Sequence, residues 1–140
     1  MAGRAGMPRD APATNPYKGQ TGIARVVKAF FHSLDGFADA WHHESAFRQE
    51  IVLAAVMIPV ACWVPATAVE RALLIGSVLL VLIVELLNSS LETAIDRISY
   101  DDHDLSRRAK DFGSAAVLVT LVLAAVVWAL VLGHRLLGYP

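Results

Sequence analysis

Charged residues are scarce in this sequence. Of its 140 residues only 18% are charged, 56% are hydrophobic, and the mean hydropathy is +0.51. A chain of this length forms one domain, and a soluble domain of that size usually carries about 25% charged residues on its surface. The shortage argues against an ordinary soluble enzyme and favours a protein that lies in a membrane.

Other absences narrow the possible functions. A single cysteine, Cys62, excludes an internal disulfide, and its apolar neighbourhood predicts a small buried hydrophobic side chain. The net charge of −1 argues against a nucleic-acid partner, which needs a basic patch. The first 20 residues lack an apolar core, so we expect no cleavable signal peptide. Neither GxxxxGK[ST] nor GxGxxG occurs, so a kinase on this chain would need a non-standard nucleotide site.

The hydrophobic residues that are present come in long runs. No charge occurs in the 19 positions of 51–69 or in the 22 positions of 112–133. Because a helix needs about 20 apolar residues to cross a bilayer core, we predict an all-α integral membrane protein. The expected spans are 50–64, 70–98 and 111–132, with a polar loop at 99–110. Thr67 is the expected N-cap of the second span, with Glu70 as its capping-box partner.

The N-terminal part divides into a tail and a helix. Residues 1–20 are rich in Pro, Gly and Ala without periodicity, which predicts a disordered tail. Residues 22–41 carry large apolar side chains at three- and four-residue spacing, and this predicts an amphipathic helix in the membrane interface. Its apolar face consists of Ile23, Val26, Val27, Phe30, Phe31, Leu34, Phe37 and Trp41.

Basic residues predict the orientation in the membrane. Six precede the first span and four follow the second, whereas the 64–71 turn holds only Arg71 and the C-terminal tail only Arg135. The positive-inside rule then places the N-terminus and the 97–110 loop in the cytoplasm and the C-terminus outside. The two basic groups are Arg4, Arg9, Lys18, Arg25, Lys28 and Arg48, and Arg97, Arg107, Arg108 and Lys110.

The second span carries an acidic stripe. A charge at the bilayer centre costs roughly 2.5–3.5 kcal/mol on insertion scales, so the carboxylate of Glu85 needs compensation or a function. At about 100° per residue, Glu85, Asn88, Glu92 and Asp96 fall within about 80° of one face. A polar seam that only joins helices is the structural alternative, but three carboxylates lack the donors that such a seam needs.

The stripe suits a hard cation and a base. Carboxylates without a His/Cys set favour Mg²⁺, and Asn88 and Glu92 could share one ion. Glu85 lies about 10 Å along the helix axis from Glu92, which leaves it available as a general base. At the expected membrane depth of Glu92 lie Glu44 and Glu50, and the facing residues are Arg107, Arg108, Lys110, Asp111 and Ser114.

Acids for Mg²⁺ beside bases for phosphate favour a phosphoryl-transfer site. The basic residues are also compatible with simple headgroup anchoring. Intramembrane carboxylates also mark ion paths, so a small transporter or proton-relay protein is an alternative of another class.

Three segments resemble the prokaryotic integral-membrane diacylglycerol kinases. They are Glu44-Ser-Ala-Phe-Arg-Gln-Glu50, Val84-Glu-Leu-Leu-Asn-Ser-Ser-Leu-Glu-Thr-Ala-Ile-Asp-Arg97 and Arg108-Ala-Lys-Asp-Phe-Gly-Ser114. The blocks occur in the family's order and spacing, and the resemblance covers roughly residues 21–135. The undecaprenol kinases share this architecture, and we keep them as the alternative, although the block 40–50 is more similar to the diacylglycerol branch.

The resemblance implies a reaction and a set of site residues. It implies a homotrimer of the bacterial inner membrane that transfers the γ-phosphate of ATP to diacylglycerol, with Mg²⁺, giving phosphatidic acid. By motif, Glu85 is the expected base, and Glu44 and Glu92 are the expected metal ligands. The residues implied for ATP are Arg25, Glu44, Glu92, Asp96, Lys110 and Asp111, and those for the lipid are Arg25, Gln49, Glu50, Glu85, Asn88 and Ser114.

Overall fold

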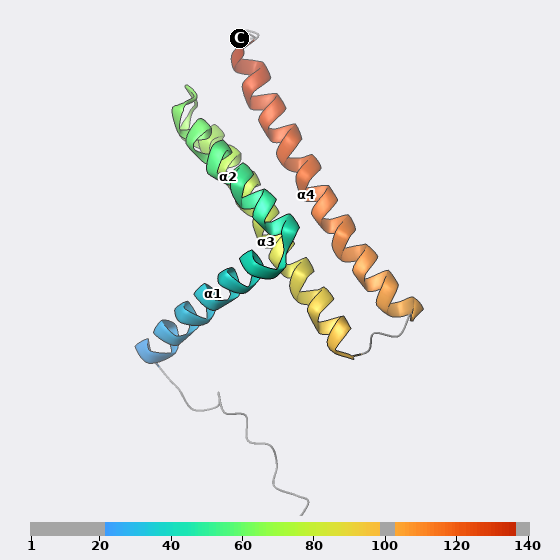
Figure 1. The fold of residues 1–140 in the computed structure, drawn as a ribbon. Coiled ribbons are helices and arrows are strands. Elements are labelled where there is room, and N and C mark those ends of the chain that lie inside the picture. Colours follow the sequence, from blue (N-terminus) through green and yellow to red (C-terminus); the bar gives the residue numbers. More distant parts are fainter. Residues whose placement is uncertain (1–21, 99–102, 137–140) are drawn as a thin grey trace, which may run out of the picture. The chain divides into compact units, whose positions relative to one another are not determined.

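The computed structural model describes residues 22–98 and 103–136, and its regular structure within these ranges is entirely helical. The helices are α1 (Ile23–His43), α2 (Ser45–Trp63), α3 (Ala68–Ile98) and α4 (Asp104–Leu136) (Figure 1). By length and composition, α2, α3 and α4 can each cross a membrane. The prediction of an all-α chain with three membrane-length helices after an N-terminal helix is confirmed. The predicted tail of residues 1–20 lies outside the described ranges.

The first part of α1 is described by itself, because contacts separate the chain up to Gly36 from the rest. Its large apolar side chains are exposed, from Ile23 at 83% to Leu34 at 47%. Phe30 and Phe31 contact each other edge to face, with ring centroids 6.0 Å apart. An unpaired apolar face of this kind is what a helix in the membrane interface needs, and that location stays a prediction.

The second part of the chain is built around α3, which packs against both α2 and α4. Small residues of α2, Ala54 and Ala61, are buried against α3, and the absence of bulk there allows close packing. Leu74 of α3 is fully buried, and its carbonyl accepts a hydrogen bond from Trp128 Nε1 of α4 at 3.2 Å. The core comprises Ala54, Ala61, Leu74, Val78, Trp128 and Val131.

Two helices begin earlier than predicted. The expected first span starts at 50, but α2 begins at Ser45, only one residue after α1 ends. The expected third span starts at 111, but α4 begins at Asp104, so the prediction of a polar loop over 99–110 is wrong for its second half. Polar residues can extend a helix beyond the apolar core of the membrane, because backbone hydrogen bonds form outside lipid as well as within it. Ion pairs of Arg107 with Asp104 and Asp111, at 3.1 and 3.9 Å, support this first part of α4.

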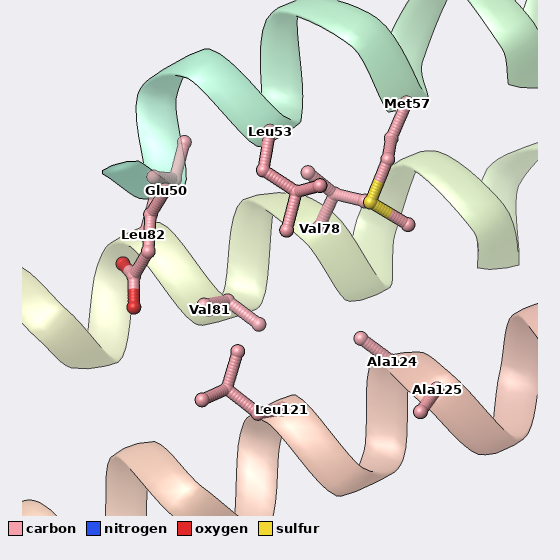
Figure 2. A pocket seen from close by; sticks show the side chains of 9 residues that line it. All are labelled: Glu50, Leu53, Met57, Val78, Val81, Leu82, Leu121, Ala124 and Ala125. Carbon is pink, nitrogen blue, oxygen red and sulfur yellow. The ribbon is translucent and has the colours of Figure 1, made fainter. Parts of the chain in front are cut away.

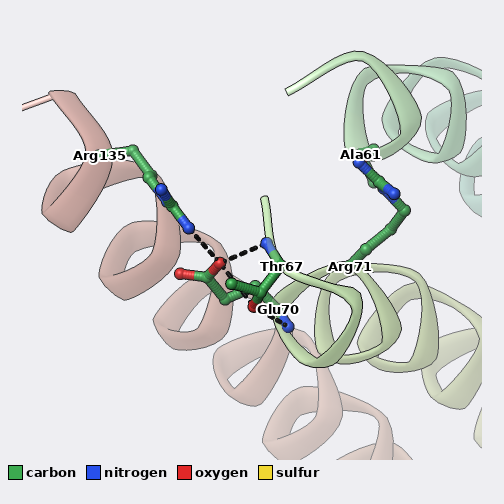
Figure 3. Close-up of polar contacts among 5 residues, drawn as sticks. All are labelled: Ala61, Thr67, Glu70, Arg71 and Arg135. Atoms are coloured by element: carbon green, nitrogen blue, oxygen red, sulfur yellow. Dashed lines mark hydrogen bonds and ion pairs between the residues drawn. The ribbon is translucent and has the colours of Figure 1, made fainter. Parts of the chain in front are cut away.

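The ends of α2, α3 and α4 that lie farthest from Glu85 are joined by polar contacts (Figure 3). The capping box is present as predicted, since Thr67 Oγ1 accepts from Glu70 N at 3.3 Å and Thr67 N donates to Glu70 Oε2 at 2.7 Å. Arg135 of α4 contacts the same carboxylate at 2.5 Å, and Arg71 Nε donates to the carbonyl of Ala61 at 3.3 Å. We call Thr67, Glu70, Arg71 and Arg135 the paired cluster.

Cys62, near the end of α2, does not occupy the core. Its side chain is exposed on this chain, so the prediction of a small buried hydrophobic side chain is wrong. An apolar run in a membrane-length helix need not face the protein interior, because lipid accepts apolar side chains equally well. Hydropathy alone therefore could not distinguish the two faces of α2.

Candidate active site

A group of carboxylates gathers around the middle of α3. Glu85 is buried, with 4% of its surface exposed. The carboxyl groups of Glu44, Glu50 and Glu92 each lie within electrostatic range of the Glu85 carboxyl group. Glu85 and Glu92 come from the α3 stripe, Glu50 from α2, and Glu44 from the residue between α1 and α2. We call these four residues the acidic cluster.

Local backbone geometry presents Glu44 to this cluster. Glu44 has extended backbone angles, φ −104° and ψ 112°, and its side chain makes no capping hydrogen bond to α2. The end of α1 is closed instead by Arg48, which donates to the carbonyls of Trp41 and His42 at 3.0 and 3.3 Å. Sequence reasoning missed this role of Arg48. The only available signal was a basic residue shortly after a helix end, which is a common arrangement.

Glu50 stands where the acidic cluster meets an apolar cavity. The cavity has a volume of about 290 Å³ and lies between α2, α3 and α4. Figure 2 shows the carboxylate of Glu50 at one end of a lining that is otherwise aliphatic. Its Oε2 atom is buried and accepts no hydrogen bond from the described part of the chain. A buried oxygen without a donor is costly, so Glu50 is a candidate for contact with a bound group.

Asn88 orients the carboxylate of Glu92. The two residues are one turn apart on α3, and Asn88 Nδ2 donates to Glu92 Oε1 at 3.1 Å. Asn88 Oδ1 faces away from Glu92 toward Gly113 of α4. In this arrangement Asn88 offers Glu92 an N–H donor. Its oxygen does not face an ion beside Glu92, in contrast to the shared-ion geometry that the spacing suggested.

Asp96 of α3 and Lys110 of α4, which the sequence predicts near the cytoplasmic side, form an ion pair. Lys110 Nζ contacts Asp96 Oδ1 at 2.5 Å, and both side chains are about two-fifths exposed. Asp96 follows Glu92 by one turn, so this pair continues the stripe by about 6 Å along α3. Asp111 is more exposed and lies 3.9 Å from Arg107.

Gln49 and Ser114 are not brought into the acidic cluster. Gln49 is exposed on α2, where it lines an open groove with Arg48, Val52, Leu53 and Val56. Ser114 is exposed on α4. Arg25 lies on the separately described part of α1, so its position relative to the cluster is not defined.

The cluster fits Mg²⁺ through the chemistry of its oxygen donors. Within the described residues, no group of three or more His, Cys, Asp or Glu side chains is arranged to hold a metal. Mg²⁺, however, is commonly bound through one or two carboxylates, with waters and substrate phosphates as the other ligands. Glu44 and Glu92 are carboxylates of the kind that such binding uses, whereas a structural zinc site would need four protein ligands.

A buried acid within a bundle of membrane-length helices, with a Lys110–Asp96 pair farther along α3, is the arrangement of a helical membrane protein with a candidate acidic site. The chain belongs to the prokaryotic diacylglycerol kinase family, whose model matches residues 31–132. The resemblance noted in the sequence is thereby confirmed.

Curated relatives agree over most of their length. The diacylglycerol kinase of Pseudomonas aeruginosa is 50% identical over 118 residues, which cover 84% of this chain and 96% of the relative. That of Escherichia coli strain K12 is 48% identical over 112 residues, covering 80% and 92%. That of Helicobacter pylori strain 26695 is 42% identical over 107 residues, covering 76% and 84%.

Proposed function

We propose that this protein is an ATP-dependent diacylglycerol kinase that transfers the γ-phosphate of ATP to the free hydroxyl of diacylglycerol, giving phosphatidic acid. The observation that carries the proposal is the burial of Glu85 among Glu44, Glu50 and Glu92, with an apolar cavity beside them. A lipid kinase needs this combination, because an apolar chain and a charged nucleotide must meet at one place.

Glu85 is the proposed general base. Its carboxylate takes the proton of the lipid hydroxyl as that oxygen attacks the γ-phosphorus. A new ester bond between oxygen and phosphorus forms, the bond from the γ-phosphorus to the bridging oxygen breaks, and ADP leaves. Glu85 then returns its proton to water. Glu85 accepts no hydrogen bond and forms no ion pair within the described residues, and this leaves its oxygens available to a substrate.

Glu44 and Glu92 are the proposed holders of Mg²⁺, with the Asn88 amide orienting Glu92. When bound, Mg²⁺ would neutralise the charge that develops on the β- and γ-phosphates. Without it, three acidic side chains around Glu85 would repel a nucleotide. We expect kinase activity to disappear on chelation and to return with added Mg²⁺.

Nucleotide and lipid are expected to bind on different sides of Glu85. For the phosphates we propose Lys110, with Asp96 holding its ammonium group, together with Asp111 and Arg25. For the lipid we propose Glu50 at the cavity mouth, with Gln49, Asn88 and Ser114 nearby along α2, α3 and α4. Arg25 is proposed to contact both substrates, and Glu85 contacts the reacting hydroxyl.

We also propose a homotrimer in the bacterial inner membrane, with the N-terminus cytoplasmic and the C-terminus outside. Large apolar side chains of α4 are exposed on the single chain, including Leu118, Val122 and Leu130 at 62%, 54% and 68%. Lipid and neighbouring copies can both cover such a face. Light scattering of the purified protein, corrected for detergent, should give three times the chain mass of 15.1 kDa.

A two-lipid kinase assay tests the function. Purified protein in micelles is given ATP, Mg²⁺ and either diacylglycerol or undecaprenol, and phosphorylated lipid is measured. We expect diacylglycerol to be strongly preferred. A preference for undecaprenol would assign the chain to the other branch. Phosphorylation of neither lipid, with proton-coupled flux in liposomes lacking ATP, would support the transporter alternative.

A further inference from the structure

Gly113 of α4 lies against Asn88 in the acidic stripe of α3. Glycine is a poor helix former, because it loses more backbone freedom than other residues, yet Gly113 stands well inside the 33-residue helix α4. A Cβ atom added at this position would collide with Asn88 Oδ1, and would lie 3.2 Å from Asn88 Cγ and 3.5 Å from Leu91 Cδ2. The space that a side chain would occupy is therefore filled by the Asn88 amide.

The Asn88 amide is held from two directions. Its Oδ1 atom is buried and has no hydrogen-bond partner within the described residues, so it rests against the backbone of Gly113. Its Nδ2 donates to Glu92 Oε1 at 3.1 Å. A flipped amide would turn its oxygen toward the carboxylate, which has no donor when ionised. The contact of Oδ1 with Gly113 and the hydrogen bond from Nδ2 to Glu92 thus select one orientation of the Asn88 amide.

We propose that Gly113 is a positioning residue, whose missing side chain lets the Asn88 amide lie against α4 and direct its N–H at Glu92. The proposal rests on the proposed function, in which Glu92 holds Mg²⁺. Hydrogen-bond partners of a metal-binding carboxylate affect metal affinity or activity by about 10–100-fold when they are removed. A methyl group at 113 would have this effect through Asn88, without touching the metal or either substrate.

The first test follows the Asn88 amide in the metal-free protein. The chain has only two asparagines, Asn15 and Asn88, so labelling with ¹⁵N-asparagine gives two side-chain NH₂ signals. We expect Gly113→Ala to shift the Asn88 pair, while Gly76→Ala, where a Cβ meets no described atom within 4 Å, leaves it in place. An Asn88 signal that is the same in both variants would overturn the proposal.

The second test measures the Mg²⁺ dependence of the kinase reaction. We expect Gly113→Ala to raise the Mg²⁺ concentration for half-maximal rate by about 10–100-fold. Gly76→Ala should stay within about twofold of the parent chain. A Gly113→Ala protein with the same Mg²⁺ requirement as the control would contradict the proposal.

A double-mutant cycle keeps the proposal testable if Gly113→Ala fails to fold. Removing the amide in Asn88→Ala makes room for the new methyl group, so Gly113→Ala should cost nothing more in that background. The double variant should fold and should need the same Mg²⁺ concentration as Asn88→Ala alone. A further loss in the double variant would show that Gly113 acts by another route. The NMR test needs no activity, so a failure of the proposed function and a failure of this proposal remain distinguishable.

Discussion

The acidic cluster and the paired cluster both contain glutamate carboxylates, but the two clusters differ in the partners that surround these carboxylates. Glu70 is satisfied by Thr67 and by Arg135 of another helix. In the acidic cluster, Glu85 is more buried than Glu70, yet it faces three further carboxylates, and the Oε2 atom of Glu50 has no partner among the described residues. One carboxylate holds helices together, whereas the others remain available to a ligand.

The contrast separates charges that stabilise the fold from charges that are proposed to bind a ligand. Buried charges without partners weaken a fold, so a protein retains them where a substrate or metal provides the missing partner. Substitutions in the acidic cluster should therefore reduce catalysis and leave folding intact or improved. Substitutions in the paired cluster should destabilise the fold and leave catalysis by the folded protein intact.

The largest effect is expected for Glu85→Gln. The amide keeps the shape of the side chain and removes the base, and loss of general-base catalysis costs about 10²–10⁴ in rate. The rate of diacylglycerol phosphorylation in micelles measures this loss. The thermal unfolding midpoint should be unchanged or higher, because repulsion from Glu44 and Glu92 is removed. A rate equal to that of the parent chain would exclude Glu85 as the base.

The next largest effect is expected for Glu92→Gln. A neutral side chain can still accept the hydrogen bond from Asn88 Nδ2, but it loses the charge that is proposed to hold Mg²⁺. We expect the Mg²⁺ concentration for half-maximal rate to rise by at least about 10-fold. Titration of the kinase rate with Mg²⁺ at saturating ATP measures it. An equal response in Glu70→Gln would mean that any lost carboxylate has this effect, and would erase the contrast between the clusters.

A stability effect without loss of function is expected for Glu70→Ala. This change removes the ion pair with Arg135 and the contacts with Thr67, so the α3–α4 connection at that end is lost. The thermal unfolding midpoint in detergent should be lower for the variant than for the parent chain. This difference should be smaller at high salt, because salt screens the ion pair in the parent chain. Activity per folded protein should stay within about twofold. A large loss of activity in the folded variant would contradict this assignment.

The smallest effect is expected for Thr67→Ala. Loss of an N-cap side chain typically costs about 1 kcal/mol, and Glu70 keeps its ion pair with Arg135. Chemical denaturation should therefore give a lower free energy of unfolding, with a smaller change than Glu70→Ala. Thr67→Ser retains the hydroxyl and serves as the matched control. Equal destabilisation by both substitutions would show that the capping hydroxyl is not responsible.

Much of the acidic site could be predicted because it lies on one helix. Helical periodicity alone placed Glu85, Asn88 and Glu92 on one face of α3. It could not show that Glu50 lies within electrostatic range of Glu85, or that Asn88 turns its N–H toward Glu92 and its oxygen toward Gly113. Those facts depend on how α2 and α4 pack against α3.

Hydropathy also did not predict the residues at which α2 and α4 begin. The apolar runs predicted spans from 50 and 111, but the helices begin at Ser45 and Asp104. Hydropathy reports where a helix meets lipid, whereas hydrogen bonding determines where the helix begins. At the start of α4, His103 Nδ1 accepts a hydrogen bond from Leu105 N at 3.2 Å, and α2 begins directly after the single extended residue Glu44.

The all-α class, the three membrane-length helices, the capping box of Thr67 and Glu70, and the acidic stripe could all be predicted from the amino-acid sequence. These are local properties, set by residues within a few turns of one another. Only the tertiary structure decided that Arg135 contacts Glu70, that Trp128 bonds to the carbonyl of Leu74, and that Gly113 makes room for Asn88. Each of these contacts joins residues on different helices. Periodicity and hydropathy contain no information about the distance between such residues.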